Sequence, residues 1–293
     1  MTIPNLFIVG APKCGTTAWV RYLSDHPEIY FSPAKEPHFF CTDFPNYRWA
    51  KTLPEYEALF AQADCEKVVG EASVNYLYSK VAAQNINEYN PQAKILVFLR
   101  DHGDFLLSYH NQLLYNRDET ITDFRTIWSS ARDGKNRHIP KTCREPAFLD
   151  YAAVGRFAEQ LERYIALFPS TNIKIVHFSD WIENPRPTYV SIIQFLGLED
   201  DGRDCFEQIH SAKRHKSAVF ANLTQRPPKS LLLASAVIKR LLGRKRLGLA
   251  KVLRYLNAEA GYASRPNNVL RDEIRSAFAK DRLKLREMTE RLQ

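Results

Sequence analysis

Four short apolar runs stand out along the chain, and each is followed by a stretch with helical periodicity. The runs cover residues 5–10, 67–71, 94–100 and 173–178 and are rich in Val, Ile, Leu and Phe. Apolar runs without polar alternation are typical of strands buried on both faces of a parallel sheet. Helical patterns between such strands indicate right-handed β–α–β crossovers. We therefore predict an α/β fold with three layers, in which helices flank a central parallel sheet.

The helical patterns are bounded by local signals in the sequence. The first begins at Gly15 and ends before Pro27, because proline cannot continue a helix. A further helix is predicted to end at Leu196, and the other predicted helices cover residues 104–116, 151–167, 229–242 and 269–289. Because no repeat or linker-like segment divides the chain, we predict a single domain over residues 1–293, with a helical and basic C-terminal part.

The composition is that of a folded, soluble protein. Hydrophobic residues make up 45% of the chain and charged residues 25%, which excludes wholesale disorder. The longest apolar run, residues 231–238, is far shorter than the roughly 20 residues that cross a bilayer. The first residues lack the features of a signal peptide, and the five cysteines form no CxxC pair. We therefore expect a cytoplasmic protein with free thiols.

Positive charge is concentrated in one segment, residues 208–258, which we call the basic block. The block contains no Asp or Glu and twelve Lys or Arg residues, although the net charge of the whole chain is only +8. Such a segment favours an anionic ligand, polymer or surface. It could also be a solvated basic face without a ligand. We do not expect nucleic acid as the partner, because no known binding module accompanies the charge.

The most informative segment for function is GAPKCGTT, from Gly10 to Thr17, between a predicted strand and a predicted helix. Unpaired backbone N–H groups and the helix dipole make the start of a helix suitable for binding an anion. The two glycines have the spacing of a Walker A loop, but Thr16 stands where that motif requires lysine. A lysine occurs inside the loop instead, at Lys13.

A second motif follows the third predicted strand. The strand ends in Arg100, and Ser108 follows eight residues later. A guanidinium group can bind phosphate oxygens in a bidentate manner, and a hydroxyl in the following helix adds a donor. Two anion sites at the carboxyl ends of neighbouring strands indicate a ligand that is phosphorylated at both ends.

Together, the loop and the strand-terminal arginine resemble the sulfotransferases that use 3′-phosphoadenosine 5′-phosphosulfate (PAPS) as donor. The resemblance implies a P-loop-like fold and PAPS as co-substrate. Arg100 and Ser108 would then hold the 3′-phosphate. The 5′-phosphosulfate would be held by the loop residues Lys13, Cys14, Gly15, Thr16 and Thr17.

The segment KEPHFF, residues 35–40, is similar to a segment of heparan sulfate 3-O-sulfotransferases and bacterial relatives. The resemblance implies that Glu36 is the catalytic base and that His38 assists it. If the segment is extended, the two side chains point the same way, because they are two residues apart. The chain departs from the related glycan enzymes at Cys41, where they have Asp, and at Ala72, where they have Lys. Both departures concern the acceptor.

Two further basic residues, Lys213 and Arg214, resemble a loop that folds over the donor's phosphates in glycan sulfotransferases. The helical segment 208–268, which contains the basic block, could act as a lid on the acceptor side, and its part 229–256 could contact a membrane surface. The same apolar residues could instead form core or a homodimer contact. We expect no metal, because a lysine can serve where kinases use Mg²⁺.

The sequence thus predicts a sulfotransferase in which Lys13 stabilises the leaving phosphate and Glu36 with His38 deprotonates an acceptor hydroxyl. A carbohydrate or glycolipid acceptor fits best. Two alternatives stay open: a P-loop kinase-like enzyme that requires ATP and Mg²⁺, and a non-enzymatic module that binds a polyanion or nucleotide through the basic block.

Overall fold

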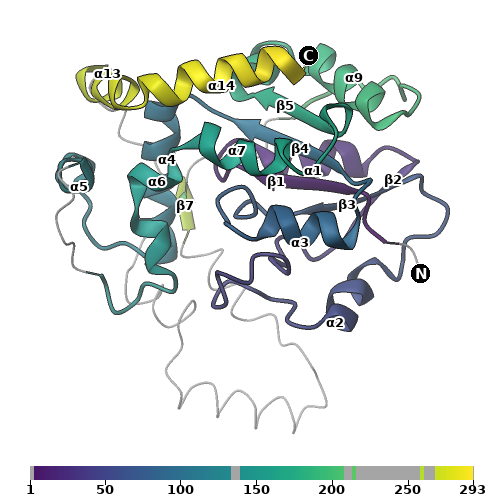
Figure 1. The fold of residues 1–293 in the computed structure, drawn as a ribbon, viewed down its shortest axis with the longest axis horizontal. Coiled ribbons are helices and arrows are strands. Elements are labelled where there is room, and N and C mark those ends of the chain that lie inside the picture. The colour runs from purple at the N-terminus through teal and green to yellow at the C-terminus, as the bar shows by residue number, and fades with distance from the viewer. Residues whose placement is uncertain (1–2, 133–138, 208–212, 216–257, 261–267, 293) are drawn as a thin grey trace, which may run out of the picture.

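The computed structural model describes residues 3–132, 139–207, 213–215, 258–260 and 268–292. Within these residues five strands form one parallel sheet, in the order β2-β3-β1-β4-β5 (Figure 1). The strands are β1 (Leu6–Gly10), β2 (Ile29–Phe31), β3 (Val68–Ala72), β4 (Lys94–Leu99) and β5 (Ile173–His177). The four predicted strands are confirmed. β2 was not predicted, because three residues at a sheet edge give no pattern.

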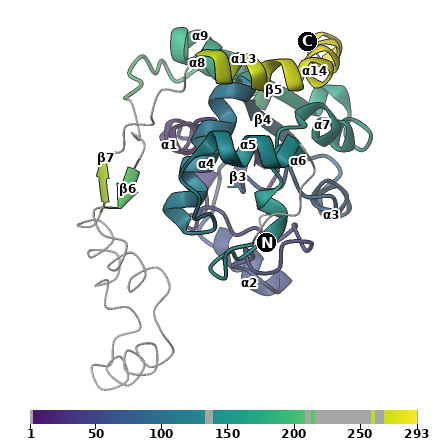
Figure 2. The ribbon, with the colours of Figure 1, turned by 90° about the vertical axis from the view of Figure 1, so that its left-hand side faces the viewer.

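Helices cover both faces of the sheet. Figure 2 shows α1 on one side and α3 with α7 on the other, which confirms the predicted three-layer α/β fold. The α-helices are α1 (Thr16–Ser24), α2 (Leu53–Glu57), α3 (Ala82–Tyr89), α4 (His102–Asn116), α5 (Phe124–Arg132), α6 (Tyr151–Val154), α7 (Phe157–Ile165), α8 (Phe178–Glu183), α9 (Pro185–Leu196), α13 (Asn268–Ala277) and α14 (Ala279–Leu292). Three short 3₁₀ helices are η1 (Ala58–Phe60), η2 (Pro146–Leu149) and η3 (Ser170–Asn172).

The sheet is the centre of the hydrophobic core. All residues of β1 and β3 are buried, as expected for strands with helices on both faces. Aromatic side chains fill the space between sheet and helices: Trp19 of α1 stacks on Phe98 of β4, with ring centroids 5.6 Å apart. Because β1 and β4 are central and rigid, the residues that follow them are held in fixed positions.

Two predicted helices are each broken into a pair. The pattern over 151–167 forms α6 and α7, and the pattern over 269–289 forms α13 and α14. The two breaks lie against each other. The ring of Phe278, between α13 and α14, packs where a Cβ atom on Gly155 would lie, 2.5 Å away. Only glycine allows the C-terminal helices to approach so closely.

Most of the basic block lies outside the described residues, and so does the predicted helix 229–242. Of residues 208–268, the structure describes two short antiparallel strands, β6 (Lys213–His215) and β7 (Ala258–Ala260), and the start of α13. The expectation of a wholly helical segment is therefore wrong at these two places. In the described parts of the chain no helix is long and apolar enough to cross a membrane.

Candidate functional site

Three loops meet at the carboxyl edge of the sheet. They follow β1, β3 and β4, which are neighbours in the strand order. After β1 the chain forms β2 and β3 on one side of β1. It then crosses to the other side of β1, where it forms β4 and β5. Ligands of open α/β sheets bind where the strand order reverses in this way. The loop from Gly10 to Thr17 and the residue Arg100 therefore face the expected binding crevice.

The loop after β1 has the shape of an anion-binding turn. Lys13 has a φ of 64° and Gly15 a φ of 86°, both in the left-handed region. A Cβ atom on Gly15 would lie 2.5 Å from the Trp181 ring, so only glycine fits there. Gly15 is the N-cap of α1 and has no side chain to cap the helix. The amides of Thr16 and Thr17, in the first turn, are thus positioned for an anion.

Lys13 and Arg100 belong to the same site. Arg100 Nη1 lies 3.5 Å from the carbonyl oxygen of Lys13, and Lys13 Nζ donates to Gln112 Oε1 at 3.0 Å. Partial burial and the charge of Arg100 lower the pKa of the Lys13 ammonium. The structure therefore brings together the two motifs that the sequence assigned to one nucleotide.

Arg100 stacks against an aromatic ring, and no ion pair with an acid is found for it within the described residues. Its guanidinium carbon lies 4.3 Å from the centroid of the Phe178 ring, and Nε is buried with no partner among the described residues. A cation that stacks on a ring and has only one long contact to a carbonyl oxygen, from Nη1 to Lys13, can still donate hydrogen bonds to a ligand. Ser108 lies one helical turn before Gln112, which contacts Lys13, so Ser108 lies on the face of α4 directed at the loop.

Cys14 can contribute to the site only through its backbone. The side chain is fully buried in the core, and Sγ donates to the carbonyl oxygen of Pro12 at 3.5 Å. Burial raises the pKa of the Cys14 thiol to about 12. A protonated, buried thiol is not a nucleophile, so we assign no chemistry to it.

The turn that carries Glu36 and His38 is not extended, contrary to the sequence-based expectation. Both residues lie in the left-handed region, with φ values of 64° and 52°. The turn is held against the end of β3, because Glu36 N donates to the Ala72 carbonyl and His38 N donates to Ser73 Oγ, each at 3.0 Å. The two side chains nevertheless meet, since Glu36 Oε2 lies 3.7 Å from His38 Nε2.

Glu36 is an ionised carboxylate in a cationic setting. Its Oε1 atom accepts a hydrogen bond from Lys35 Nζ at 2.7 Å. Burial alone would raise the pKa of Glu36, but the nearby His38 ring and the charge of Lys35 outweigh it and hold the pKa at about 2. The base predicted from the sequence is therefore present in its proton-accepting form at neutral pH.

Backbone strain is concentrated in the candidate site. Among the described residues four that are not glycine have a positive φ: Lys13, Glu36, His38 and Arg117. Three of these are the residues that the sequence predicted to be catalytic. Such conformations cost of order 1–3 kcal/mol each and cluster at functional sites, because only a required geometry justifies them.

The two departures on the acceptor side have structural counterparts. Cys41 is buried and donates to the carbonyl oxygen of His38 at 3.2 Å, so it supports the turn. Asp43, two residues later, accepts from Ser79 Oγ at 2.6 Å and from Lys80 N at 2.8 Å. Asp43 thus caps the segment before α3 and does not replace a carboxylate at position 41. Ala72 supplies its carbonyl group to Glu36 N.

Sequence reasoning assigned no role to three polar residues at the site: Lys35, Gln112 and Glu71. Glu71 of β3 is only 1% exposed, and Tyr56 OH lies 3.4 Å from its Oε2 atom. Burial raises the pKa of Glu71 to about 7. A charged residue inside an apolar strand was the available signal for Glu71. Nothing in the sequence indicated the long-range contacts of Lys35 and Gln112.

Lys213 and Arg214 lie in β6, where their backbones face Ala260 and Glu259 of β7. Cα atoms of β6 lie within 8 Å of Cα atoms of α4, the helix that carries Ser108. The placement supports the predicted role of both residues at the donor's phosphates, but that role stays a prediction.

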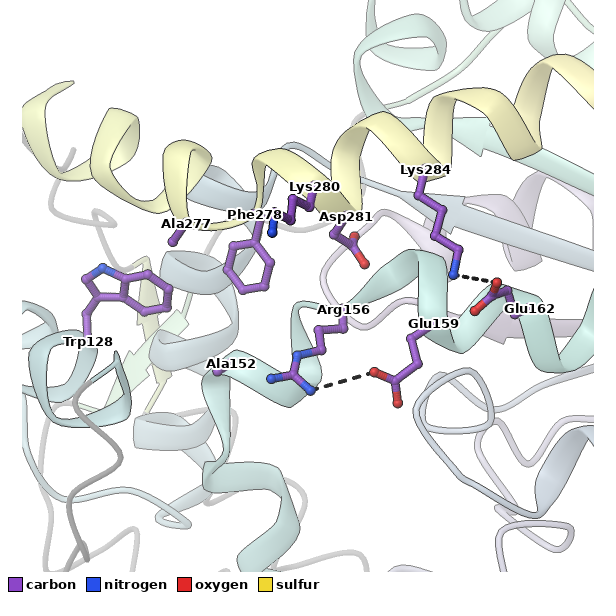
Figure 3. A pocket seen from close by; sticks show the side chains of 10 residues that line it. All are labelled: Trp128, Ala152, Arg156, Glu159, Glu162, Ala277, Phe278, Lys280, Asp281 and Lys284. Atoms are coloured by element: carbon purple, nitrogen blue, oxygen red, sulfur yellow. Dashed lines mark ion pairs between the residues drawn. The ribbon is translucent and has the colours of Figure 1, made fainter.

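A cleft of about 540 Å³ lies between α5, α6, α7 and the C-terminal helices (Figure 3). Four of its charged side chains form two pairs: Arg156 lies 3.7 Å from Glu159, and Lys284 lies 2.5 Å from Glu162. Asp281 at its floor accepts from Ala158 N at 3.1 Å. Because these charges neutralise one another, we do not place the functional site there.

No group of His, Cys, Asp and Glu side chains suited to a metal ion occurs within the ranges that the structure describes. The expectation that the chain needs no metal stays a prediction.

A parallel sheet with a loop of this shape after β1 and an arginine after β4 defines a P-loop-like α/β protein. The comparison with protein families gives the particular family. A family model described as "Sulfotransferase domain" matches residues 4–230, and the chain belongs to this family.

Curated relatives and solved structures agree with this assignment. Heparan sulfate glucosamine 3-O-sulfotransferase 5 of Mus musculus is 25% identical over 196 residues, which cover 67% of this chain and 54% of the relative. Bifunctional heparan sulfate N-deacetylase/N-sulfotransferase 2 of Bos taurus is 28% identical over 208 residues, which cover 67% of this chain and 22% of the relative. The chain thus spans about half, or less, of the length of these relatives. Superposition on the crystal structure of a sulfotransferase from Alicyclobacillus acidocaldarius gives a TM-score of 0.61 at 29% sequence identity. The match covers 86% of this chain and 100% of the chain in that crystal structure.

Proposed function

We propose that this protein transfers a sulfuryl group from PAPS to a hydroxyl group of a carbohydrate or glycolipid acceptor. One observation carries the proposal: the donor loop and the base are joined by a single side chain, because Lys35 Nζ contacts both Thr17 Oγ1 at 3.0 Å and Glu36 Oε1 at 2.7 Å. The predicted donor site and the predicted acceptor base therefore lie next to each other, as a direct transfer requires.

The donor is proposed to bind along the carboxyl ends of β1 and β4. The amides of the loop from Cys14 to Thr17 and the Lys13 ammonium would bind the 5′-phosphosulfate. Arg100 and Ser108 would bind the 3′-phosphate, with Lys213 and Arg214 as further cations near α4. ATP has no 3′-phosphate, so this arrangement favours PAPS over a nucleoside triphosphate.

The reaction is a displacement at sulfur. The acceptor oxygen forms a new bond to the sulfuryl sulfur, while the bond between sulfur and the bridging oxygen of the 5′-phosphate breaks. The acceptor proton passes to Glu36, and the electron pair of the broken bond stays on the phosphate, where Lys13 stabilises it. The products are a sulfate ester and 3′-phosphoadenosine 5′-phosphate (PAP).

A glycan acceptor is supported by the relatives, which are named for action on heparan sulfate. The basic block would suit an anionic glycan or the headgroup region of a glycolipid. Cytoplasmic location, contact of residues 229–256 with a membrane surface and a homodimer are further parts of the proposal.

A transfer assay with labelled PAPS tests the proposed function. The purified protein is offered a panel of glycans and glycolipids in a buffer that contains a metal chelator. Glu36→Gln, which cannot accept a proton, is the comparison. We expect label on at least one glycan or glycolipid, and a rate about 10²–10⁴-fold lower for the variant. Transfer from ATP that requires Mg²⁺, with none from PAPS, would show a kinase instead.

A further inference from the structure

The side chain of Lys35 extends from the KEPHFF segment to the donor loop. Its Nζ atom lies 3.0 Å from Thr17 Oγ1, on the first turn of α1, and 2.7 Å from Glu36 Oε1. The side chain is 25% exposed, so it can be changed without opening the core. Neither contact could be read from the sequence, because positions 17 and 35 are 18 residues apart.

The other side of the turn is fixed by uncharged contacts. Glu36 N and His38 N donate to the end of β3, as described above, and these bonds fix the backbone. They do not orient the Glu36 carboxylate, which has rotatable bonds of its own. Of its two oxygens, Oε2 lies 3.7 Å from His38 Nε2, beyond ordinary hydrogen-bond length, whereas Oε1 has the shorter contact with Lys35. Lys35 is thus the stronger constraint on the direction of the carboxylate.

Building on the proposed function, we propose that Lys35 is a positioning residue for the transfer: its ammonium group holds the Glu36 carboxylate against the donor loop at Thr17. Through this bridge the base would keep a fixed place relative to the sulfuryl group of the donor. Reactions of this kind are sensitive to such placement, because a misplacement of about 1 Å can reduce the rate about 10²-fold.

The contact between Lys35 and Glu36 should also affect the pKa of Glu36, because several charged or titratable groups surround this carboxylate. Lys35 and His38 from its own loop face the carboxylate, and Lys13 of the donor loop and Glu71 of β3 act on it from the elements packed against the turn. Removal of the Lys35 charge takes away one of the groups that favour the ionised form of Glu36. The Glu36 carboxylate should then take up a proton at a higher pH than in the wild type.

The test compares Lys35→Met, which keeps the length but not the charge, with Lys35→Arg, which keeps both. Lys67→Met is the matched control, because Lys67 also pairs with a glutamate, Glu28 at 2.5 Å, at the opposite edge of the sheet. For each protein we would measure kcat and KM for PAPS and acceptor, the pH profile of kcat/KM, and the Kd of PAP by calorimetry.

We expect Lys35→Met to lower kcat by about 10–100-fold and to move the acidic limb of the pH profile to higher pH, with the Kd of PAP close to the wild-type value. Lys35→Arg should restore most of the activity, and Lys67→Met should match the wild type. If Lys35→Met does not fold, Lys35→Gln gives the same comparison without charge.

Two results would overturn the inference. One is a kcat and pH profile of Lys35→Met that match those of the Lys67→Met control. The other is a loss of PAP affinity as large as the loss of rate, which would make Lys35 a donor-binding residue. Failure of the proposed function looks different, because then the wild type itself neither binds PAP nor transfers label.

Discussion

At the scale of single residues, the site depends on side chains held in unfavourable backbone conformations. Lys13, Glu36 and His38 all have positive φ values, and each is fixed by contacts with a neighbouring strand or helix. A strained residue that is held in this way cannot relax when the ligand leaves, so the site is organised in advance. The pKa of the Lys13 ammonium is lowered by burial and by Arg100, and an anionic ligand between the two cations would relieve their repulsion.

Lys13→Ala should therefore lower the turnover of sulfuryl transfer by about 10²–10³-fold, the usual cost of removing one group that stabilises developing charge. Steady-state kinetics with saturating PAPS measures the effect. Lys80→Ala, at an exposed lysine outside the site, is the control and should leave turnover unchanged. Near-normal kcat in Lys13→Ala would show that Lys13 does not act on the leaving group.

Glu71 should make the stability of the protein fall as pH rises. Its folded-state pKa of about 7 lies above the ordinary value of 4.5, so between these pH values the unfolded chain ionises while the folded protein keeps the proton. Relative to Glu71→Gln, the wild type should lose about 3 kcal/mol of unfolding free energy from pH 4.5 to pH 8. Urea unfolding at both pH values measures the difference. Parallel changes in the two proteins would contradict the assignment.

At the scale of elements, two ion pairs join α13 to the start of α4, directly after Arg100 of the predicted 3′-phosphate site. Asp101 follows Arg100 and caps α4, accepting from Gly103 N at 3.1 Å. Burial would raise the pKa of Asp101, but the hydrogen bond from Arg275 of α13, at 3.0 Å, lowers it. A second pair joins Arg271 to Asp104 at 2.6 Å. The C-terminal helices thus brace the turn from which Arg100 reaches the site.

Arg275→Ala should weaken the binding of PAP by about two- to fivefold, the range expected from the loss of a partly exposed ion pair. Calorimetric titration with PAP measures the change in Kd. The control is Arg286→Ala, which removes an exposed pair with Glu290 on α14 and should leave Kd unchanged. Equal affinities in the two variants would mean that α13 does not support the 3′-phosphate site.

The sequence predicted the elements that carry the donor site better than those that carry the acceptor site. The strands before Lys13 and Arg100 are apolar runs, and a loop between strand and helix has a strong local signal. The turn at Glu36 depends on hydrogen bonds to Ala72 and Ser73, about 35 residues away, so its left-handed conformation could not be predicted. The contact of Gly155 with Phe278 likewise joins residues far apart in the sequence, so it could not be predicted either.

At the scale of the whole molecule, cations from different elements meet at one edge of the sheet. The loop after β1 and the guanidinium after β4 bring cations from different parts of the chain to adjacent positions. The basic block adds twelve Lys and Arg residues between β5 and the C-terminal helices. The two alternative functions differ in how this charge is used: a kinase would need Mg²⁺ and ATP, and a polyanion-binding module would need no nucleotide.

The most direct test is calorimetric titration of the wild type and Arg100→Ala with PAP and with ATP, in buffer containing a metal chelator. The account predicts that the wild type binds PAP without metal and much more tightly than ATP. Arg100→Ala should lose about 10–100-fold in PAP affinity, the cost of charge-assisted hydrogen bonds to one phosphate, and should bind ATP as before. Equal binding of PAP and ATP, or unchanged PAP affinity in Arg100→Ala, would contradict the claim that this edge of the sheet holds a nucleotide phosphorylated at both ends.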